Sequence, residues 1–541
     1  MTKVSNKYLV ITCVMSTLLL IGMLAFPFGP DQSIFEIGGE MIFKKGAIPY
    51  RDFIEMKQPL IFYIYGFTNW VFGNHEWSIR LFDVIYHIFT LAILFKLLRK
   101  VYQNEKIAIL SVFLYTLYYT GGGYWTTAQT ESFALLPLLI IASAVLQFEE
   151  RLNSFKQVSW LGAKIGIAFF ILISLKFTLA FALLGIFPVV VFHSNQNYKT
   201  KLRFILSTVF FAVSSIVLTG FAIYLSGGWN NFVDCLISIS HYADIVPLFS
   251  IETYKTIYFH QFPENFIGAI SATYILLSII GIVLSFTKDL QTKKLPSSIR
   301  IFHLIILWQL AFGLLGVLFE RKNFAYHYLR IAWTLFPFIS IGIIYCFEFL
   351  RKISHEKGIN RFTKSKYLIF VCILLCVTLF FSPFPKVIYQ PIEWSWIAIH
   401  NDALKRSEKI YAGDQEKDQN ENTLQYLKAQ LASGDQLFFW GNNTRIYFLT
   451  GTLPPTLCIA NTLFVSPWTP LSWKEQMMEQ LQKARPLFFI CEYNDSRYSL
   501  TGTKLDSYSS LLKWDDLRNY LFTKYRLQDS TSRFKIYSRI Q

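Results

Sequence analysis

Residues 30–59 read PDQSIFEIGGEMIFKKGAIPYRDFIEMKQP and hold nine charged side chains. An apolar run over 8–28 precedes this stretch, and a second apolar run over 59–73 follows it. The first run is long enough to cross a bilayer, which takes about 20 mostly apolar residues. The second run is too short, so we expect it to form a helix in the outer leaflet. The charged stretch is therefore predicted to lie at the membrane surface, as an amphipathic helix that Gly46 ends.

The composition of the whole chain is that of a membrane protein. Of the 541 residues, 53% are hydrophobic and 18% aromatic, and the mean hydropathy is +0.37. Only 16% are charged, against about 25% in an ordinary soluble domain. These values exclude a disordered chain and argue against a wholly soluble enzyme. The net charge of +16 lies in short clusters between apolar runs, so we expect no nucleic-acid partner.

Eleven apolar runs are candidate membrane-spanning helices. The first is too long for the core of a cleavable signal peptide, and no small-residue cleavage motif follows it. The fifth and sixth are short, because Lys176 interrupts them. The eleven predicted spans cover residues 8–28, 79–98, 105–121, 131–148, 160–175, 177–192, 204–226, 266–286, 301–319, 328–350 and 367–383.

The distribution of Lys and Arg predicts the orientation of these spans. With a cytoplasmic N-terminus, the basic clusters fall in the inner loops; residues 351–366 hold six Lys and Arg, whereas the outer loop 121–131 holds none. We expect an integral protein of a bacterial inner or plasma membrane with its N-terminus in the cytoplasm. An odd number of spans places the C-terminal residues outside the cytoplasm.

The expected fold class is a polytopic α-helical membrane protein with an extracytoplasmic α/β domain. Residues 1–383 form the membrane domain, with a first outer loop over 29–78, and residues 384–541 form the second domain. Cys458 and Cys491 lie in that domain, and the sequence leaves open whether they form a disulfide. Its expected elements are helices near 420–432 and 471–484, strands at 436–440 and 486–491, and a hairpin over 525–540.

Asp31 is the first candidate for chemistry, since it lies just beyond the last apolar residue of the first span. A carboxylate beside low-dielectric surroundings can serve as a general base. The plainer interpretation is that Asp31 caps the surface helix.

Further polar residues are expected on the same side of the membrane. These residues have simple structural explanations. An acid before a span complements the helix dipole, and cations at an interface often extend their charged ends to water. Acids and cations together would also suit a lipid-linked phosphate, because a carboxylate activates the nucleophile and cations neutralise the leaving phosphate. These residues are Glu131, Lys176, His327, Tyr328 and Arg330. The seven Cys and nine His show no ligand spacing, so we expect no metal and no cofactor.

One pattern runs from the first loop into the second span, and it consists of Asp31, Phe35, Gly46, Pro49, Tyr50, Asp52, Lys57, Pro59, Leu60, Phe72, Gly73, Glu76, Arg80 and Leu81. Thr130-Glu131 and His327-Tyr328 extend it. The pattern resembles the GT-C-fold glycosyltransferases that use polyprenyl-phosphate sugars. The nearest classes are the protein-mannosyltransferase-like family 39 and the aminoarabinose lipid A transferases.

The resemblance implies an inverting transfer of a sugar from a polyprenyl-phosphate donor to a hydroxyl of a glycan, lipid or protein on the outer face. Asp31 matches the catalytic base, and Lys57 matches the lysine near the donor phosphate. Donor phosphate or sugar binding is also expected of Arg51, Glu131, Lys176, His327, Tyr328 and Arg330.

Two positions depart from the family pattern. Gln32 follows Asp31 where the family often has Glu, and Gln58 stands where it usually has Pro. The first departure removes the second acid that protein mannosyltransferases use, which favours a bacterial-type enzyme acting on glycans or lipids.

Two other functions fit a membrane protein of this kind. A transporter or flippase for lipid-linked glycans should show repeated halves and broken helices near mid-membrane. A non-catalytic assembly subunit would use the C-terminal domain for binding. The sequence shows no internal repeat, and its charges cluster at one face, so the glycosyltransferase is the preferred interpretation.

Overall fold

A computed structural model describes residues 7–149, 154–247, 250–291, 297–355, 384–402, 405–406 and 417–540. The chain divides into two compact units, each built from segments that are far apart in the sequence. Unit 1 contains residues 1–26, 80–216 and 249–402, and unit 2 contains residues 27–79, 217–248 and 403–541. The first loop therefore shares a unit with the C-terminal residues.

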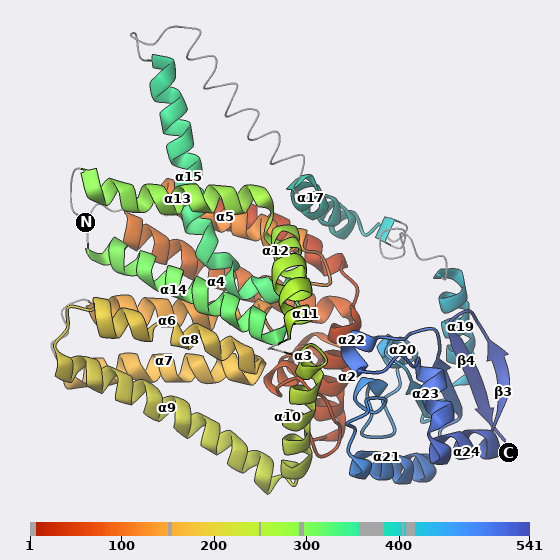
Figure 1. The fold of residues 1–541 in the computed structure, drawn as a ribbon. Coiled ribbons are helices and arrows are strands. Elements are labelled where there is room, and N and C mark those ends of the chain that lie inside the picture. Colours follow the sequence, from red (N-terminus) through yellow and green to blue (C-terminus); the bar gives the residue numbers. More distant parts are fainter. Residues whose placement is uncertain are drawn as a thin grey trace. The chain divides into compact units, whose positions relative to one another are not determined.

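Unit 1 is a bundle of helices (Figure 1). Helices α4 and α9 begin or end in unit 2, because each crosses a boundary between the units. The helices with residues in unit 1 are α1 (Lys7–Ile21), α4 (Glu76–Tyr102), α5 (Glu105–Gly121), α6 (Leu135–Glu149), α7 (Phe155–Leu175), α8 (Phe181–Leu184), α9 (Tyr198–Leu225), α11 (Ile251–Thr253), α12 (Phe262–Ile270), α13 (Ala272–Gln291), α14 (Ser297–Glu320), α15 (Leu329–His355) and α17 (Phe384–His400).

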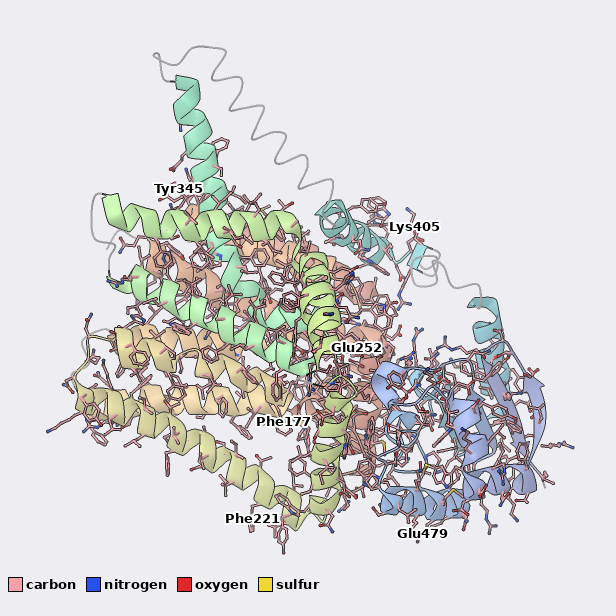
Figure 2. All side chains as sticks on the ribbon, in the orientation of Figure 1. Phe177, Phe221, Glu252, Tyr345, Lys405 and Glu479 are labelled. Carbon is pink, nitrogen blue, oxygen red and sulfur yellow. The ribbon has the colours of Figure 1, made fainter. Side chains whose placement is uncertain are left out.

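Among the described residues, seven helices are long and apolar enough to cross a membrane, or eight if one bent pair counts as a span. They confirm the prediction of a polytopic α-helical membrane protein. Large apolar side chains along α9 are exposed, and Phe221, near its C-terminal end (Figure 2), is 57% exposed. Such an apolar outer surface is what lipid contact requires, because hydrocarbon solvates it better than water does.

Two of the eleven predicted spans differ from the helices of the structure, and a third cannot be compared with them. The predicted span 177–192 is wrong as a single helix, since it consists of short helical pieces broken at Gly185 and Ile186. The predicted span 266–286 contains a bend of 87° between α12 and α13, at Ser271. Ser271 has a φ of 82°, which interrupts a right-handed helix. The span 367–383 lies outside the described residues.

In unit 2, α2 (Pro30–Lys45) and α3 (Leu60–Phe72) form a helical hairpin. Gly39 and Gly66 let the two backbones meet, because a Cβ on Gly39 would lie 2.4 Å from the nitrogen of Gly66. Gly46 ends α2 in the left-handed conformation with φ 66°, as predicted. The prediction of an amphipathic surface helix, with its acids on the solvated face, is wrong for Glu36 and Glu40, which are buried.

The buried acids of α2 have polar partners on the chain that follows it. The amide of Asn69 donates to Glu36, and Asn74 Nδ2 donates to Glu40 Oε2 at 3.1 Å. Burial raises the pKa of Glu36 well above its usual value.

The rest of unit 2 comprises helix α10 (Trp229–Asp244) and an α/β domain with one four-stranded sheet in the order β1-β2-β4-β3. β1 and β2 are parallel, while β2–β4 and β4–β3 are antiparallel. The elements of this domain are α19 (Lys417–Gln430), β1 (Leu437–Trp440), α20 (Arg445–Thr450), α21 (Leu471–Ala484), β2 (Phe488–Glu492), α22 (Tyr498–Thr501), α23 (Ser507–Lys513), α24 (Asp515–Lys524), β3 (Tyr525–Ser530) and β4 (Phe534–Arg539).

The predicted helices, strands and closing hairpin of the C-terminal domain are confirmed. Alternate residues of β1 and β2, among them Trp440 and Phe489, pack with Trp473 of α21 and Leu521 of α24 in one buried core. Both faces of these two strands are buried, which is typical of strands in an α/β layer. The domain boundary at 383/384 stays a prediction.

Cys458 and Cys491 are both free thiols and both buried, so the structure contains no disulfide between them. Cys458 lies where the first loop meets the domain. Ile54 pairs with Cys458 as an isolated β-bridge, and the backbone nitrogen of Ile54 donates to the carbonyl of Leu457 at 2.9 Å. The loop that carries Lys57 is thereby attached to the α/β domain.

Candidate active site

Asp31 lies in the first turn of α2, whose start is set by Gly29 and Pro30. Gly29 is the N-cap in an extended conformation, and Pro30 opens the helix with its fixed φ. Asp31 is therefore not the cap, and its carboxylate, 32% exposed, is available beside the helix N-terminus. An anion is stabilised there by the helix dipole.

Lys57 is the cation nearest to this carboxylate in the contacts of the described residues. Its Nζ lies 3.8 Å from Oδ2 of Asp31, with 21% of the lysine side chain exposed. The ammonium also lies 6.0 Å from the ring centre of Phe35, one turn further along α2. The hydroxyl of Tyr50 donates to the backbone carbonyl of Lys57 at 3.1 Å, which holds the loop in place.

Glu55 is a second acid in the same loop. Burial raises its pKa to about 7; Lys57 opposes this shift, and Asp31 adds to it. Its carboxylate accepts hydrogen bonds from the backbone of Met56 and Lys57. The loop therefore carries a carboxyl group that changes charge near neutral pH, within electrostatic reach of Asp31 and Lys57.

Arg51 does not join Asp31 and Lys57. Its guanidinium makes a two-point ion pair with the adjacent Asp52, at 2.6 Å between Nη2 and Oδ2. Asp52 also accepts the backbone N–H of Ile48 at 2.8 Å, which closes the turn around Pro49. The expected donor-binding role of Arg51 remains a prediction, with its charge balanced by Asp52.

The other candidates lie in unit 1, and four of the five form one buried ionic cluster. Lys176 Nζ lies 2.7 Å from Glu131 Oε1 and 2.7 Å from Glu320 Oε2. Arg330 Nη2 lies 2.9 Å from Glu131 and 2.6 Å from Glu320. His327 Nδ1 lies 2.9 Å from Glu320. The structure thus brings together residues from four separate segments of the chain.

Tyr328 is the candidate outside this cluster. Its buried ring packs against Phe262 and Phe266 of α12. Glu320 is the residue that sequence reasoning missed, although it joins Lys176, His327 and Arg330. The available signal was an acid at the outer end of the predicted span 301–319, next to Arg321 and Lys322.

Helix α4 holds the loop in which Glu131 lies. The guanidinium of Arg80 donates to the carbonyl and hydroxyl of Thr127, at 3.1 Å and 2.8 Å. Asp83, fully buried, accepts from the hydroxyl of Tyr119 at 2.6 Å and from the backbone of Ala128 at 3.1 Å. These bonds satisfy an otherwise costly buried acid, and they fix the segment that leads to Glu131.

The charges of the cluster compensate one another. Two carboxylates, Glu131 and Glu320, face two cations, Lys176 and Arg330, at hydrogen-bond distance. Glu131, Glu320 and His327 each offer a ligand atom within 4.8 Å of the others. This donor set does not suit a divalent metal, because the ammonium and guanidinium already occupy the carboxylate oxygens that an ion would need.

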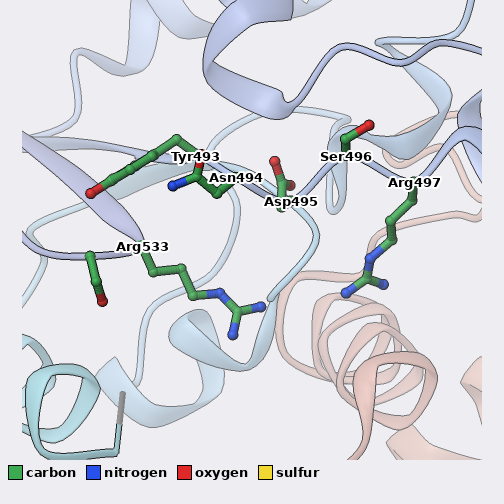
Figure 3. Close-up of a pocket in the computed structure, with 7 residues that line it drawn as sticks. Tyr493, Asn494, Asp495, Ser496, Arg497 and Arg533 are labelled. Atoms are coloured by element: carbon green, nitrogen blue, oxygen red, sulfur yellow. The ribbon is translucent and has the colours of Figure 1, made fainter. Parts of the chain in front are cut away.

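A polar pocket of about 310 Å³ lies in the α/β domain (Figure 3). Arg497 and Arg533 line it, together with Tyr493, Asn494, Asp495, Ser496 and Ser532. Arg533 is paired with Glu492 at 2.7 Å, and Asp495 accepts hydrogen bonds from Asn442 and Ser507. Arg533 and Asp495 thus stabilise the structure of the α/β domain itself.

Residues 56–219 match the family of dolichyl-phosphate-mannose-protein mannosyltransferases. Over 99% of the chain, the fold is similar to that of ArnT from Cupriavidus metallidurans, solved bound to undecaprenyl phosphate and in the apo state. Each ArnT structure is 11% identical, is covered over 98% of its length and has a TM-score of 0.57. The archaeal oligosaccharyltransferase AglB from Archaeoglobus fulgidus is 12% identical, with 98% of this chain and 74% of AglB covered, but at a TM-score of 0.47 it carries no weight. No curated protein sequence matches the chain.

The fold shared with ArnT and the apolar helices define a polytopic integral membrane protein. Residues 56–219, which contain Lys57, match the mannosyltransferase family, and together with the fold this match supports a membrane glycosyltransferase. The preferred interpretation of the sequence is confirmed at this level, over the transporter and the assembly subunit.

Proposed function

We propose that this glycosyltransferase moves a sugar from a polyprenyl-phosphate donor to an acceptor hydroxyl at the outer membrane face, with inversion. The observation that carries the proposal is the pair formed by Asp31 and Lys57, an acid and a cation 3.8 Å apart at the start of α2. Binding of undecaprenyl phosphate by ArnT supports the choice of donor.

In the proposed reaction, the acceptor oxygen attacks the anomeric carbon while its proton passes to the carboxylate of Asp31. The bond between the anomeric carbon and the phosphate oxygen breaks on the opposite face. The electron pair leaves with polyprenyl phosphate, whose charge Lys57 neutralises. When the phosphate takes the ammonium of Lys57, the ion pair between Lys57 and Asp31 opens, and the carboxylate of Asp31 can take the proton of the acceptor.

The cluster in unit 1 has a different role in this proposal. Lys176 and Arg330 are neutralised by Glu131 and Glu320, so Lys57 is the main cation for the phosphate. The cluster holds the ends of the spans that provide Glu320 and Arg330. The N-terminus lies in the cytoplasm, and the α/β domain lies outside it.

The test uses purified protein in nanodiscs with a panel of polyprenyl-phosphate sugars and candidate acceptors. Release of free polyprenyl phosphate is measured for wild type, Asp31→Asn and the control Asp515→Asn, whose carboxylate lies 77% exposed in the α/β domain. We expect release by wild type and Asp515→Asn for one donor. Asp31→Asn should bind that donor normally but turn over about 10²–10⁴-fold more slowly, as for loss of a general base.

Two results would count against the proposal. A normal rate for Asp31→Asn would remove Asp31 as the base. A folded wild-type protein that binds lipid phosphate but releases none from any donor and acceptor would contradict the donor class.

A further inference from the structure

Glu76, at the N-terminus of α4, links the chain before Asp31 to the C-terminal residues of unit 2. Its Oε1 accepts the backbone N–H of Phe28 at 3.1 Å and two bonds from Arg445, at 3.0 Å from Nε and 2.8 Å from Nη2. Its Oε2 accepts Nη2 of Arg406 at 2.7 Å. The carboxylate is only 13% exposed, so these charge-assisted bonds are poorly screened by solvent.

A second contact lies two residues beyond Asp31. The hydroxyls of Ser33 and Thr444 share a hydrogen bond of 2.9 Å, and both side chains are fully buried. Thr444 is the N-cap of α20, the helix that begins with Arg445. Helix α20 lies beside α2 (Figure 1), so the first turn of one helix faces the first turn of the other.

An aromatic contact also joins α20 to the chain just before α2. The ring of Phe28 meets the ring of Phe448 edge-to-face, with centroids 4.9 Å apart. Phe28 is 4% exposed and therefore anchored. Asp31 thus lies between two residues, Phe28 and Ser33, that are both held by α20 and its N-cap.

The position of a general base controls the rate of proton transfer, and a displacement of about 1 Å can cost about 10²-fold. Asp31 is carried by the first turn of α2, and its carboxylate is paired with Lys57 at 3.8 Å. The first turn of α2 begins with the bond from Ser33 N to Gly29 O at 3.0 Å. The bonds of Glu76 and Thr444 flank this turn on both sides.

We propose that Arg445, with Arg406 and Glu76, is a positioning clamp by which the C-terminal α/β domain holds the first turn of α2, and Asp31 with it, in the catalytic orientation. The domain then contributes to catalysis through α20 without touching the substrate. The inference rests on the proposed function, in which Asp31 is the base.

The test compares Arg445→Gln with Arg445→Lys and with the control Arg518→Gln. Arg518 belongs to the same domain and forms an exposed ion pair with Asp515 at 2.8 Å. We expect Arg445→Gln to lower kcat per folded molecule about 10–10²-fold, with little change in the KM for donor. Arg445→Lys should recover part of the rate, because lysine keeps the positive charge but lacks the planar guanidinium that donates two hydrogen bonds to a carboxylate. Arg518→Gln should behave as wild type.

A double-mutant cycle separates positioning from general damage. If Arg445 acts through Asp31, Arg445→Gln should have almost no further effect on the residual rate in the Asp31→Asn background. Equal loss in both backgrounds, or a kcat for Arg445→Gln equal to that of Arg518→Gln, would overturn the clamp.

Hydrogen exchange gives a readout that does not depend on activity. Amides over residues 30–36 should exchange faster in Arg445→Gln than in wild type, while those of β2 stay protected. Unchanged exchange over 30–36 would overturn the clamp even if Asp31 proves to be the base. Faster exchange together with a fully active Asp31→Asn would instead overturn the proposed function and leave the mechanical link intact.

Discussion

Lys57 Nζ lies 3.8 Å from Asp31 Oδ2, and this ion pair joins the chain between α2 and α3 to the N-terminus of α2. Asp31 lies in the first turn of α2, and Lys57 follows the turn that comes after this helix. Because the pair is partly exposed, its own contribution to stability is small, at about 0–1 kcal/mol. Its importance is chemical, since it places a cation beside the proposed base.

Replacing Lys57 by Ala should weaken donor binding. A charge-assisted bond to phosphate is worth about 1.5–3 kcal/mol, which corresponds to roughly a 10–10²-fold higher KM for donor. Lys44→Ala is the matched control, because Lys44 pairs with Glu40 on α2 and is 57% exposed. The measurement is donor KM from polyprenyl phosphate release. An unchanged KM in Lys57→Ala would remove Lys57 from the phosphate site.

Glu55 should make the stability of the protein depend on pH. Its pKa in the folded protein is about 7, above the ordinary value of 4.5, so the folded state holds the proton more tightly. This contribution is complete below about pH 4.5 and is lost as the pH rises through 7. Melting in detergent at about pH 5 and about pH 8 should show a smaller fall in Tm for Glu55→Gln than for wild type. Identical falls would contradict the raised pKa.

The ionic cluster in unit 1 should be essential for stability. Glu320→Gln leaves Lys176 and Arg330 with one carboxylate between them in a buried site, which typically costs about 3–5 kcal/mol. We expect a clearly lower Tm in nanodiscs, whatever the activity. Glu264→Gln serves as the control, because Glu264 is 71% exposed and faces only His260 at 3.5 Å. Equal Tm values for the two variants would show that the cluster is not stabilising.

Removal of divalent metal should leave turnover unchanged. Lys176 and Arg330 already compensate the charges of Glu131 and Glu320, and the hydroxyl of Thr130 donates to the second carboxylate oxygen of Glu131. The release assay is run after extensive treatment with EDTA, and again after readdition of Mg²⁺, Mn²⁺ or Zn²⁺. A loss that one of these ions restores would contradict metal independence.

The α/β domain should be accessible from outside the cell. Glu479 is an exposed residue of α21 (Figure 2), so Glu479→Cys in a cysteine-free chain provides a label site. A membrane-impermeant maleimide should modify it in intact cells. Modification only after permeabilisation would place the domain in the cytoplasm and overturn the predicted orientation.

Local sequence patterns were enough to predict most elements. Apolar runs, the stop at Gly46 and the strands around Phe438 and Phe489 depend on residues that are neighbours in the chain. The exceptions are places where packing overrides a local pattern. Segment 177–192 has the composition of a span but breaks at Gly185, and α12 and α13 bend at Ser271.

The candidate site was predictable only in part. Asp31 and Lys57 stand out because they are charges in a conspicuous loop, whereas Glu320 resembles any acid at the end of a span. Glu36 and Glu40 were expected to face solvent, and only the packing of α2 against α3 shows that they are buried.

The amino-acid sequence alone determined that this is a helical membrane protein with a second, α/β domain, because transfer of apolar side chains out of water depends on local composition and period. Only the tertiary structure decided which charges meet. Glu76 and Arg445, or Glu131 and Arg330, are far apart in the chain, and their pairing results from the packing of whole helices. The free energy of a buried ion pair depends on that geometry, which no local pattern encodes.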